Sequence, residues 1–493
     1  MSLRGADLRF VLPHQVETAT LLLPAHDVRV APISRSLEAA GVRVHLGWPD
    51  EYAQRERDLV VAAARDADRA LQVAARAHLL LGRIRSNRQP ANRRRGVPLL
   101  IRGAVTRPET VVPISPLAAL QYYLNRMSFP PMQAGRLRNR AFVALTRGPV
   151  APERLMPESA LATLVIEGAE PRRVPAMVRA AESLGVPAEA QWVLTLGRGD
   201  DLQRSVFHLL HNGQRRWVLK FGRVPGAAAS FDRDAAGLNL VRSFGGTTAD
   251  HAPIHLGCLQ VGGHSGSVET AAPGRPLLEL LGKRPLLPLI DLIAAWVLQM
   301  DLTSAAPAAA LQPERRRLER DVLPAWRAYG APDDLVERLP AVPAVLQHND
   351  LGTWNVVTDG RAFMAVDWES ARPDGMPLWD LCYFLADALP RLQGSADRDT
   401  YLKRALTLFA GRSPHSPLLF RWIRDAVRAL QIPAAAVGPL VTLCWLHHGL
   451  SADARTDALA SSAAAPLGHL ALLGRHWLAH PDLGPSWSAW ESG

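Results

Sequence analysis

The chain has 493 residues, of which 48% are hydrophobic and 6% aromatic. This length and composition exclude an intrinsically disordered chain and predict two or three packed domains. The formal net charge of +10 belongs to the N-terminal region, because residues 1–186 hold 27 Lys and Arg against 16 Asp and Glu.

Signals for membrane insertion and secretion are missing from the sequence. No run approaches 18 consecutive apolar residues, and residues 1–10 lack the apolar core of a secretion signal. The three cysteines, Cys258, Cys382 and Cys444, are far apart. We therefore expect a cytoplasmic protein with buried thiols, without a membrane span, a disulfide framework or a zinc site.

Short strands and helices alternate in the first 186 residues. The expected elements are strands at 20–23, 42–46, 59–62 and 78–81, and helices at 32–40 and 67–77. This alternation predicts a parallel α/β sheet, and it resembles a Rossmann-like unit of the methyltransferase or glycosyltransferase kind. After the first strand the chain reads Pro24-Ala25-His26-Asp27, without the glycine fingerprint of a cofactor site. We therefore expect residues 1–186 to form a degenerate Rossmann-like domain.

A basic stretch lies between Arg83 and Arg107, where six further arginines occur with no acid. Two interpretations stay open: a binding surface for an anionic ligand, or a solvated loop. Binding of single-stranded nucleic acid would need interleaved aromatic side chains. The stretch has none before Tyr122, so a nucleic-acid partner is not expected.

The region from residue 187 begins with a strand pattern, after a linker at 185–190. Strands are expected at 192–196, 205–210 and 216–222, with a turn containing Gly197 and Gly199 and an Asn-Gly hairpin at Asn212. Such a sheet can lay a glycine-containing loop over ATP phosphates. Lys220, one of three lysines in the chain, lies in the third strand. Its ammonium group could hold the phosphates, although a surface lysine on an edge strand is the alternative.

The most informative motif is His348, Asp350 and Asn355 in an H-x-D-x-x-x-x-N pattern, followed by Asp367 after the apolar run 362–366. Phosphoryl transfer from ATP needs a carboxylate that accepts the proton of the acceptor hydroxyl, and oxygen ligands for magnesium. This spacing supplies both from one hairpin-like unit. The alternative is a turn with two capping side chains.

With Trp354 before the asparagine and Asp367-Trp368-Glu369 at the metal position, the motif resembles the aminoglycoside phosphotransferase and choline kinase family. The resemblance covers about three-fifths of the chain. It implies an α+β bilobal protein-kinase-like domain at 187–493, with a small lobe at about 187–272 and a large lobe at about 273–493. It also implies ATP-dependent phosphorylation of a hydroxyl group on a small molecule such as an aminoglycoside, sugar or amino alcohol.

The resemblance further implies roles for individual residues. Asp350 would orient or deprotonate the acceptor hydroxyl. Asn355 and Asp367 would hold Mg²⁺, assisted by Glu369. Lys220 would bind the ATP phosphates, paired with Asp234, or as second choice Asp232, on a following helix.

The segment 268–277 resembles the hinge of a kinase, where Glu269 and Ala271 would lie beside the adenine. A core helix is expected at 278–303. Asp380 would brace the catalytic loop, and His348 would support the loop rather than transfer protons. Neither D-F-G nor A-P-E is present, which argues against a protein substrate.

Two other functions stay open. One is a binding or scaffolding protein whose kinase fold has lost turnover. The other is a bifunctional glycan-biosynthesis enzyme, in which the N-terminal domain handles a sugar.

Overall fold

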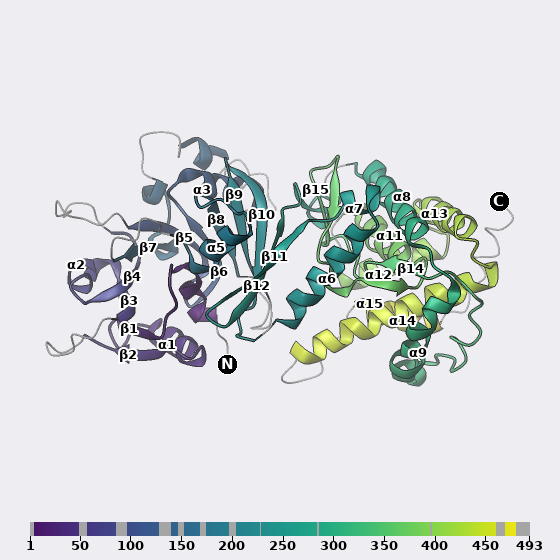
Figure 1. Ribbon diagram of the computed structural model, residues 1–493, viewed down its shortest axis with the longest axis horizontal. Coiled ribbons are helices and arrows are strands. Elements are labelled where there is room, and N and C mark those ends of the chain that lie inside the picture. Colours follow the sequence, from purple (N-terminus) through teal and green to yellow (C-terminus); the bar gives the residue numbers. More distant parts are fainter. Residues whose placement is uncertain are drawn as a thin grey trace. The chain divides into compact units, whose positions relative to one another are not determined.

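The computed structural model describes residues 4–48, 57–84, 96–127, 140–145, 152–167, 174–196, 204–226, 228–282, 285–394, 397–459 and 469–479. The chain divides into two compact units, which we call the sheet unit and the helical unit (Figure 1). The sheet unit comprises Met1–Asp232 and His255–Ala271, and the helical unit comprises Arg233–Ile254 and Ala272–Gly493.

A twelve-stranded sheet runs through the sheet unit, in the order β11-β12-β10-β9-β8-β6-β5-β7-β4-β3-β1-β2. Its strands are β1 (Thr18–Leu22), β2 (Arg43–Leu46), β3 (Arg57–Ala63), β4 (Ala75–Leu81), β5 (Val97–Ala104), β6 (Arg107–Pro113), β7 (Leu161–Ile166), β8 (Gln191–Thr195), β9 (Ser205–His211), β10 (Gln214–Phe221), β11 (His255–Val261) and β12 (His264–Thr270). Its main helices are α1 (Val30–Ala39), α2 (Ala67–Ala70), α3 (Leu117–Tyr122) and α5 (Ala176–Ala180).

The predicted parallel sheet is found in β1 to β4, which pair in parallel. Val60 and Val61 are both buried although they point to opposite faces, as expected where both faces of a sheet are covered. The helix predicted at 67–77 is wrong in length. It ends at Ala70, because the chain already enters β4 at Ala75. The Rossmann-like character of this region stays a prediction.

The strands that follow continue this sheet in antiparallel pairing. β6 pairs with β8 through Thr110 opposite Thr195 and Val111 opposite Leu194. One hydrophobic core contains residues from both ends of the sheet, including Leu21 and Val268. The division predicted at residues 186 and 187 therefore does not coincide with the boundary between the compact units.

The strands from β8 onward agree with the prediction from sequence. β9 and β10 form the expected hairpin, and the turn residues Asn212 and Gly213 have φ values of 51° and 72°. Two positive φ values in succession are the geometry that favours an Asn-Gly pair. The hairpin sets the register in which Lys220 faces its neighbours.

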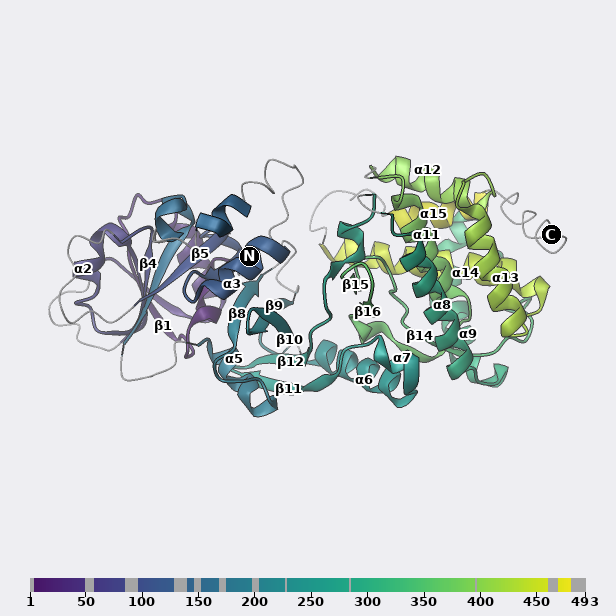
Figure 2. The ribbon, with the colours of Figure 1, turned by 90° about the horizontal axis from the view of Figure 1, so that it is seen from above.

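The helical unit contains two small sheets, β13-β15-β16 and β14-β17, among its helices (Figure 2). Its strands are β13 (Arg275–Pro276), β14 (Val345–Gln347), β15 (Val356–Thr358), β16 (Phe363–Ala365) and β17 (Arg372–Gly375). Its helices are α6 (Ala229–Ser243, from Arg233 on), α7 (Gly246–Asp250), α8 (Leu287–Ser304), α9 (Gln312–Arg317), α10 (Leu323–Trp326), α11 (Trp379–Arg391), α12 (Arg398–Phe409), α13 (Ser416–Ala429), α14 (Ala434–Leu459) and α15 (His469–Ala479). Ile293 of α8, Phe384 of α11 and Trp445 of α14 belong to one buried core.

Helix α8 is the core helix predicted at 278–303, although it begins only at Leu287. By length and composition it could cross a membrane, and it is the single such helix in the described part of the chain. Half of it is buried within the protein, as in a core helix.

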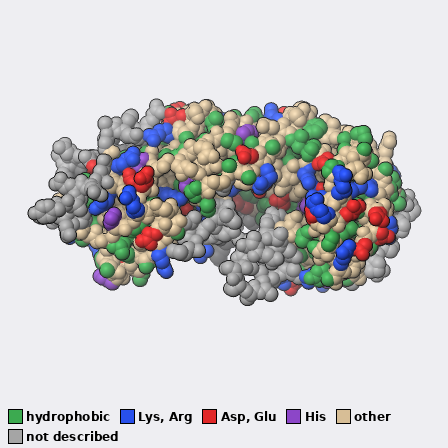
Figure 3. All heavy atoms as spheres, turned by 60° about the horizontal axis from the view of Figure 1, so that its bottom comes forward, with side chains coloured by type: hydrophobic (Ala, Val, Ile, Leu, Met, Phe, Trp, Pro, Cys, Tyr) green, Lys and Arg blue, Asp and Glu red, His purple; other side chains and the backbone are tan. Residues whose placement is uncertain are grey.

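The cysteines and the basic stretch differ in part from expectation. Cys382 and Cys444 are buried free thiols, but Cys258 is exposed. Most of the basic stretch, residues 85–95, lies outside the described residues. On the face drawn in Figure 3, positive and negative side chains of the described residues are interspersed.

Candidate active site

The H-x-D-x-x-x-x-N motif forms the loop between β14 and β15 in the helical unit. Within this loop the side-chain amide of Asn355 donates to Asp350, at 2.9 Å to the main-chain oxygen and 3.2 Å to Oδ2. The Tyr383 hydroxyl lies 3.4 Å from the other carboxylate oxygen of Asp350. Asn355 is buried and Asp350 is half-buried, so the carboxylate keeps access to solvent while its orientation is set from two sides.

Two buried acids of α11 fix the conformation of this loop by accepting hydrogen bonds from it. Asp380 accepts the main-chain N–H groups of His348 (2.5 Å) and Asn349 (2.9 Å). Asp387 accepts both the main-chain N–H (2.8 Å) and the hydroxyl (2.5 Å) of Thr353. The acids are seven residues apart, so they lie on one face of α11. The bracing predicted for Asp380 is confirmed, and Asp387 is a second brace that the sequence analysis missed.

Burial gives Asp380 an unusual charge state. It raises the pKa of the carboxyl to about 7, although the N–H groups of His348 and Asn349 oppose the shift. Asp301 of α8 lies near it, and burial together with Asp380 raises the pKa of Asp301 well above its usual value. The floor of the catalytic loop therefore holds fewer negative charges near neutral pH than its carboxyl groups suggest.

His348 links the loop between β14 and β15 to the segment that follows β16. Its Nε2 lies 3.1 Å from the main-chain oxygen of Val366, which can only accept, so Nε2 carries the proton. Burial lowers the pKa of His348 to about 4, so the ring is neutral. A buried neutral ring fits the predicted supporting role.

Asp367 directly follows β16 and has a left-handed backbone, with φ 69°. Such a backbone is uncommon for a residue other than glycine and is typical of functional sites. The Val366 N–H donates to the Asn355 main-chain oxygen at 2.8 Å, which brings the two predicted metal ligands to neighbouring positions. Glu369 lies half-buried in the short 3-10 helix Trp368–Ser370.

The donor set fits magnesium bound together with a nucleotide. Among the described residues, no three His, Cys, Asp or Glu side chains converge as a metal site. The Asn355 amide nitrogen is committed to Asp350, so its side-chain oxygen can serve as a ligand beside the Asp367 carboxylate. Mg²⁺ is usually held by one or two protein groups, with phosphates and water completing the octahedron. Asn355 and Asp367 suit that arrangement, and the contribution of Glu369 stays a prediction.

A chain of hydrogen bonds reaches Asn349, the residue before Asp350. Asn349 has φ 62°, and its side-chain oxygen lies 2.9 Å from Nε2 of His447 on α14. Nδ1 of the same ring lies 3.1 Å from the guanidinium of Arg317, which also pairs with the buried Glu314. Because arginine can only donate, Nδ1 accepts and Nε2–H donates to Asn349. The sequence analysis also missed this chain of hydrogen bonds, because its residues are far apart in the sequence.

Helix α6 packs directly on the metal segment. A side-chain Cβ at Gly237 would lie 2.1 Å from the main-chain oxygen of Trp368, so only glycine fits there. The Ala365 N–H donates to the His251 main-chain oxygen at 2.8 Å, and the His251 ring stacks on Phe363. Asp234 of α6 is fully buried. Its charge raises the pKa of His348 and so opposes part of the lowering caused by burial.

The predicted phosphate-binding lysine lies in the sheet unit. Its ammonium is 3.0 Å from the Glu269 carboxylate on β12, and both side chains are almost completely buried. The partner of Lys220 predicted from sequence was Asp234, with Asp232 as second choice. Lys220 also pairs with Glu269, which the sequence analysis had placed at the hinge, and the pairing with Asp234 stays a prediction.

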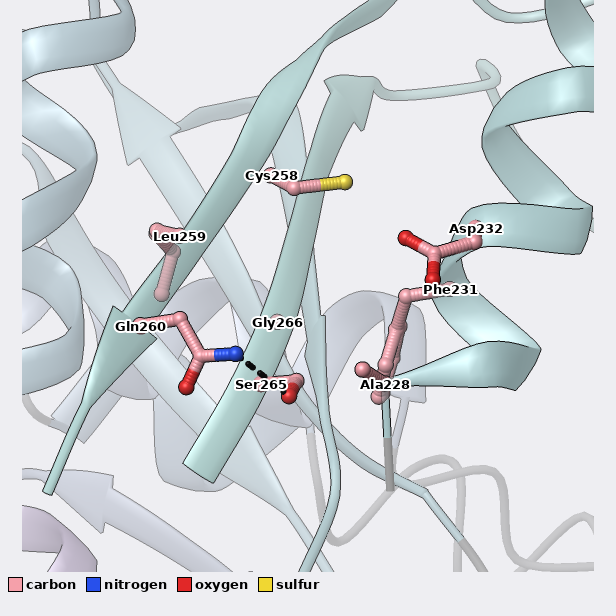
Figure 4. A pocket seen from close by; sticks show the side chains of 8 residues that line it. All are labelled: Ala228, Phe231, Asp232, Cys258, Leu259, Gln260, Ser265 and Gly266. Atoms are coloured by element: carbon pink, nitrogen blue, oxygen red, sulfur yellow. Dashed lines mark hydrogen bonds between the residues drawn. The ribbon is translucent and has the colours of Figure 1, made fainter. Parts of the chain in front are cut away.

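The other predicted nucleotide contacts are less defined. The Ala271 N–H donates to the Arg216 main-chain oxygen at 2.8 Å, and a contact of Ala271 with the adenine stays a prediction. Gly197 and Gly199 lie outside the described residues. A cavity of about 180 Å³ lies between β11, β12 and the start of α6 (Figure 4). It is smaller than the usual ligand pocket, so we do not assign the nucleotide to it.

Part of the chain matches a known protein family. Residues 197–418 match the sequence model of the phosphotransferase enzyme family, which confirms the predicted resemblance for that region. No curated protein matches the sequence.

Several solved structures are distantly similar to the chain. An aminoglycoside-3'-phosphotransferase of type VIII is 19% identical, with 51% of this chain and 98% of that chain covered and a TM-score of 0.30. An aminoglycoside phosphotransferase from Streptomyces rimosus, in complex with ADP and streptomycin, is 14% identical over 49% and 92% of the chains, with a TM-score of 0.28. WbdD, with a kinase inhibitor, is 13% identical over 87% of each chain, with a TM-score of 0.26. These superpositions are weak, so the chemistry is inferred from this chain's own residues.

Proposed function

We propose that the protein transfers the γ-phosphoryl group of ATP to a hydroxyl group of a small molecule. The observation that carries this proposal is the double role of Asn355. Its side chain orients Asp350, and its main-chain oxygen binds Val366 beside Asp367. The general base and the metal ligands are thereby joined in one hydrogen-bonded unit, in the arrangement that phosphoryl transfer requires.

Each group then has a defined task. The acceptor oxygen forms a bond to the γ-phosphorus while the bond from that phosphorus to the β–γ bridging oxygen breaks, and ADP leaves. The hydroxyl proton passes to Asp350, whose carboxylate is held by Asn355 and Tyr383. Bound magnesium would neutralise charge on the phosphates, and Asn355 and Asp367 would hold it. Lys220 would bind the phosphates.

The full chain offers a direct test. Calorimetry should show ATP binding that weakens when magnesium is chelated, and a screen of hydroxylated metabolites should find one that drives ADP release. Sugars, sugar acids, amino alcohols and aminoglycosides should all be included. Absence of nucleotide binding at millimolar ATP would overturn the proposal in favour of a binding or scaffolding protein.

A further inference from the structure

We infer that His447 of helix α14 positions the proposed general base, Asp350, through the side chain of Asn349. The inference rests on the proposed phosphoryl transfer. It goes beyond that function by naming a positioning residue that lies 98 residues along the chain from Asn349, outside the motif.

Asn349 is the residue at which the chain turns toward Asp350. Its φ of 62° is left-handed, which is uncommon for a residue other than glycine and is adopted most readily by Asn and Asp. Such a backbone persists where the surrounding contacts determine it. Because Asn349 immediately precedes Asp350, its backbone conformation sets the direction in which the Asp350 carboxylate points.

Two helices of the helical unit hold Asn349 at separate atoms. Its main-chain N–H donates to Oδ1 of Asp380 on α11, at 2.9 Å. Its side-chain oxygen accepts a hydrogen bond from Nε2 of His447 on α14, also at 2.9 Å. The contact at the N–H leaves rotation about the N–Cα bond, and the contact at the side chain restricts that rotation. His447 therefore helps to keep Asn349 in its left-handed conformation.

The His447 ring is itself held in place. It is 7% exposed and stacks on Trp379, with ring centroids 5.1 Å apart and 22° between the planes. The Trp379 indole N–H donates to the main-chain oxygen of Leu440, also on α14, at 2.9 Å. Arg317 lies 3.1 Å from Nδ1 of the ring and is bound by both carboxylate oxygens of the buried Glu314. A fixed ring presents its donor at a defined point, as the support of a catalytic group requires.

The next residue of α14 reaches Asp350 by a second route. The His448 ring stacks on Tyr383, with ring centroids 4.0 Å apart and 15° between the planes. The Tyr383 hydroxyl lies 3.4 Å from Oδ1 of Asp350. A hydrogen bond of this length is weak, so the route through Tyr383 adds to the one through Asn349 and does not replace it.

Two substitutions at His447 separate its hydrogen bond from its bulk. His447→Phe keeps a ring against Trp379 but removes the donor to Asn349. Turnover of the full chain with the identified acceptor should fall about ten- to a hundredfold, with KM for ATP unchanged, because a displaced base slows the chemical step. His447→Gln keeps an N–H that can reach Asn349 and should restore most of this loss. Gly438→Ala, on the same helix, is the control, since a Cβ there meets nothing within 4 Å.

A double-mutant cycle tests whether His447 acts through Asn349. Asn349→Gly accepts the left-handed backbone but has no side chain to receive the hydrogen bond. In this background His447→Phe should cause no further loss of turnover. A merely structural role of His447 would give additive losses instead. Additive losses, or equal losses in His447→Phe and His447→Gln, would overturn the inference.

Hydrogen exchange tests the same contact without turnover. The Gly352 N–H donates to the Asp350 main-chain oxygen at 2.8 Å, so its exchange reports the conformation of the loop. Exchange at Gly352 should be faster in His447→Phe than in His447→Gln. Unchanged protection in His447→Phe would also overturn the inference. Faster exchange in His447→Phe, in a protein that transfers phosphate to no acceptor, would instead refute the proposed function alone.

Discussion

The two compact units hold their important side chains by different means. In the helical unit, the loop between β14 and β15 is fixed by buried acids of one helix, Asp380 and Asp387, which accept main-chain N–H groups. In the sheet unit, Lys220 is fixed by the register of neighbouring strands, which places Glu269 beside it. The first arrangement controls the shape of a loop, and the second places a carboxylate beside one ammonium group. Damage to the two units should therefore have different consequences.

The largest effect is expected in the helical unit. Asp350→Asn should preserve the fold and ATP binding but lower turnover by roughly 10²–10⁴-fold, the usual contribution of a positioned general base. Asp367→Asn should also lose magnesium-dependent ATP affinity, because it removes a ligand charge. Steady-state kinetics with the identified acceptor and calorimetry with and without magnesium would separate the two variants. Full activity in Asp350→Asn would mean that the motif is only a capped turn.

The next effect concerns the attachment of α6 to the helical unit. Gly237→Ala would place a methyl group against the main-chain oxygen of Trp368, and overpacking of this kind typically costs about 1–3 kcal/mol. Gly438→Ala on α14 is the matched control, since a Cβ there meets nothing within 4 Å. In that helix, alanine should be neutral or stabilising by about 0.5–1 kcal/mol. Thermal unfolding of both variants measures the difference, and equal midpoints would show that α6 is free to shift.

Acidification should weaken the sheet unit selectively. The unfolded pKa of histidine is about 6.5. His208 has a pKa of about 3 in the folded protein. The free energy of unfolding therefore falls as the pH drops below 6.5, because the unfolded chain then binds more protons than the folded one. Burial also lowers the pKa of His264 in this unit. From pH 7 to pH 5, we expect His208 to cost about 1–2 kcal/mol of the free energy of unfolding.

The helical unit should resist the same change. His348 has a pKa of about 4, so it also lowers the free energy of unfolding as the pH falls, as His208 does. Asp380 has a pKa of about 7, so below pH 7 the folded state binds its proton more readily than the unfolded chain does. Asp380 therefore raises the free energy of unfolding as the pH falls from 7 to 5. Hydrogen exchange of β9 and α11 amides at pH 7 and pH 5 would compare the units. Equal loss of protection in both would contradict this assignment.

The smallest effect is expected for the N-terminal strands. The segment after β1, Pro24 to Asp27, lacks the glycines that let a cofactor approach the backbone. Its Asp27 is already paired with Arg29, at 2.6 Å. Thermal unfolding should therefore not change when S-adenosylmethionine is added. An increase of several degrees in the midpoint would show that this region binds the cofactor in another way.

Local spacing made the helical-unit site predictable. His348, Asp350, Asn355 and Asp367 lie within 20 residues, and the loop between two short strands brings them together directly. The Asn212-Gly213 turn likewise identified its hairpin, because only a few residues accept that backbone.

Side-chain pairs that form only through long-range packing could not be predicted from local sequence spacing. Glu269 reaches Lys220 through the pairing of β10 with β12, 49 residues apart, and His447 reaches Asn349 from α14. The pairing of β6 with β8, which continues one sheet across residue 186, likewise has no local signal in the sequence. Asp387 could have been found, because its spacing from Asp380 places both on one helix face.

The pairing of β6 with β8 has a practical consequence for anyone who shortens the chain. Cutting at residue 187 would leave β8 with a row of unpaired main-chain groups, and such edges associate with other chains. It would also remove Phe10, whose ring packs 4.8 Å from that of Phe221, and Asp7, which lies 3.4 Å from the buried Arg223. The chain from residue 187 on thus packs against the first residues of the protein through β10 and Arg223. Isolated from them, it should aggregate before its catalytic activity can be measured.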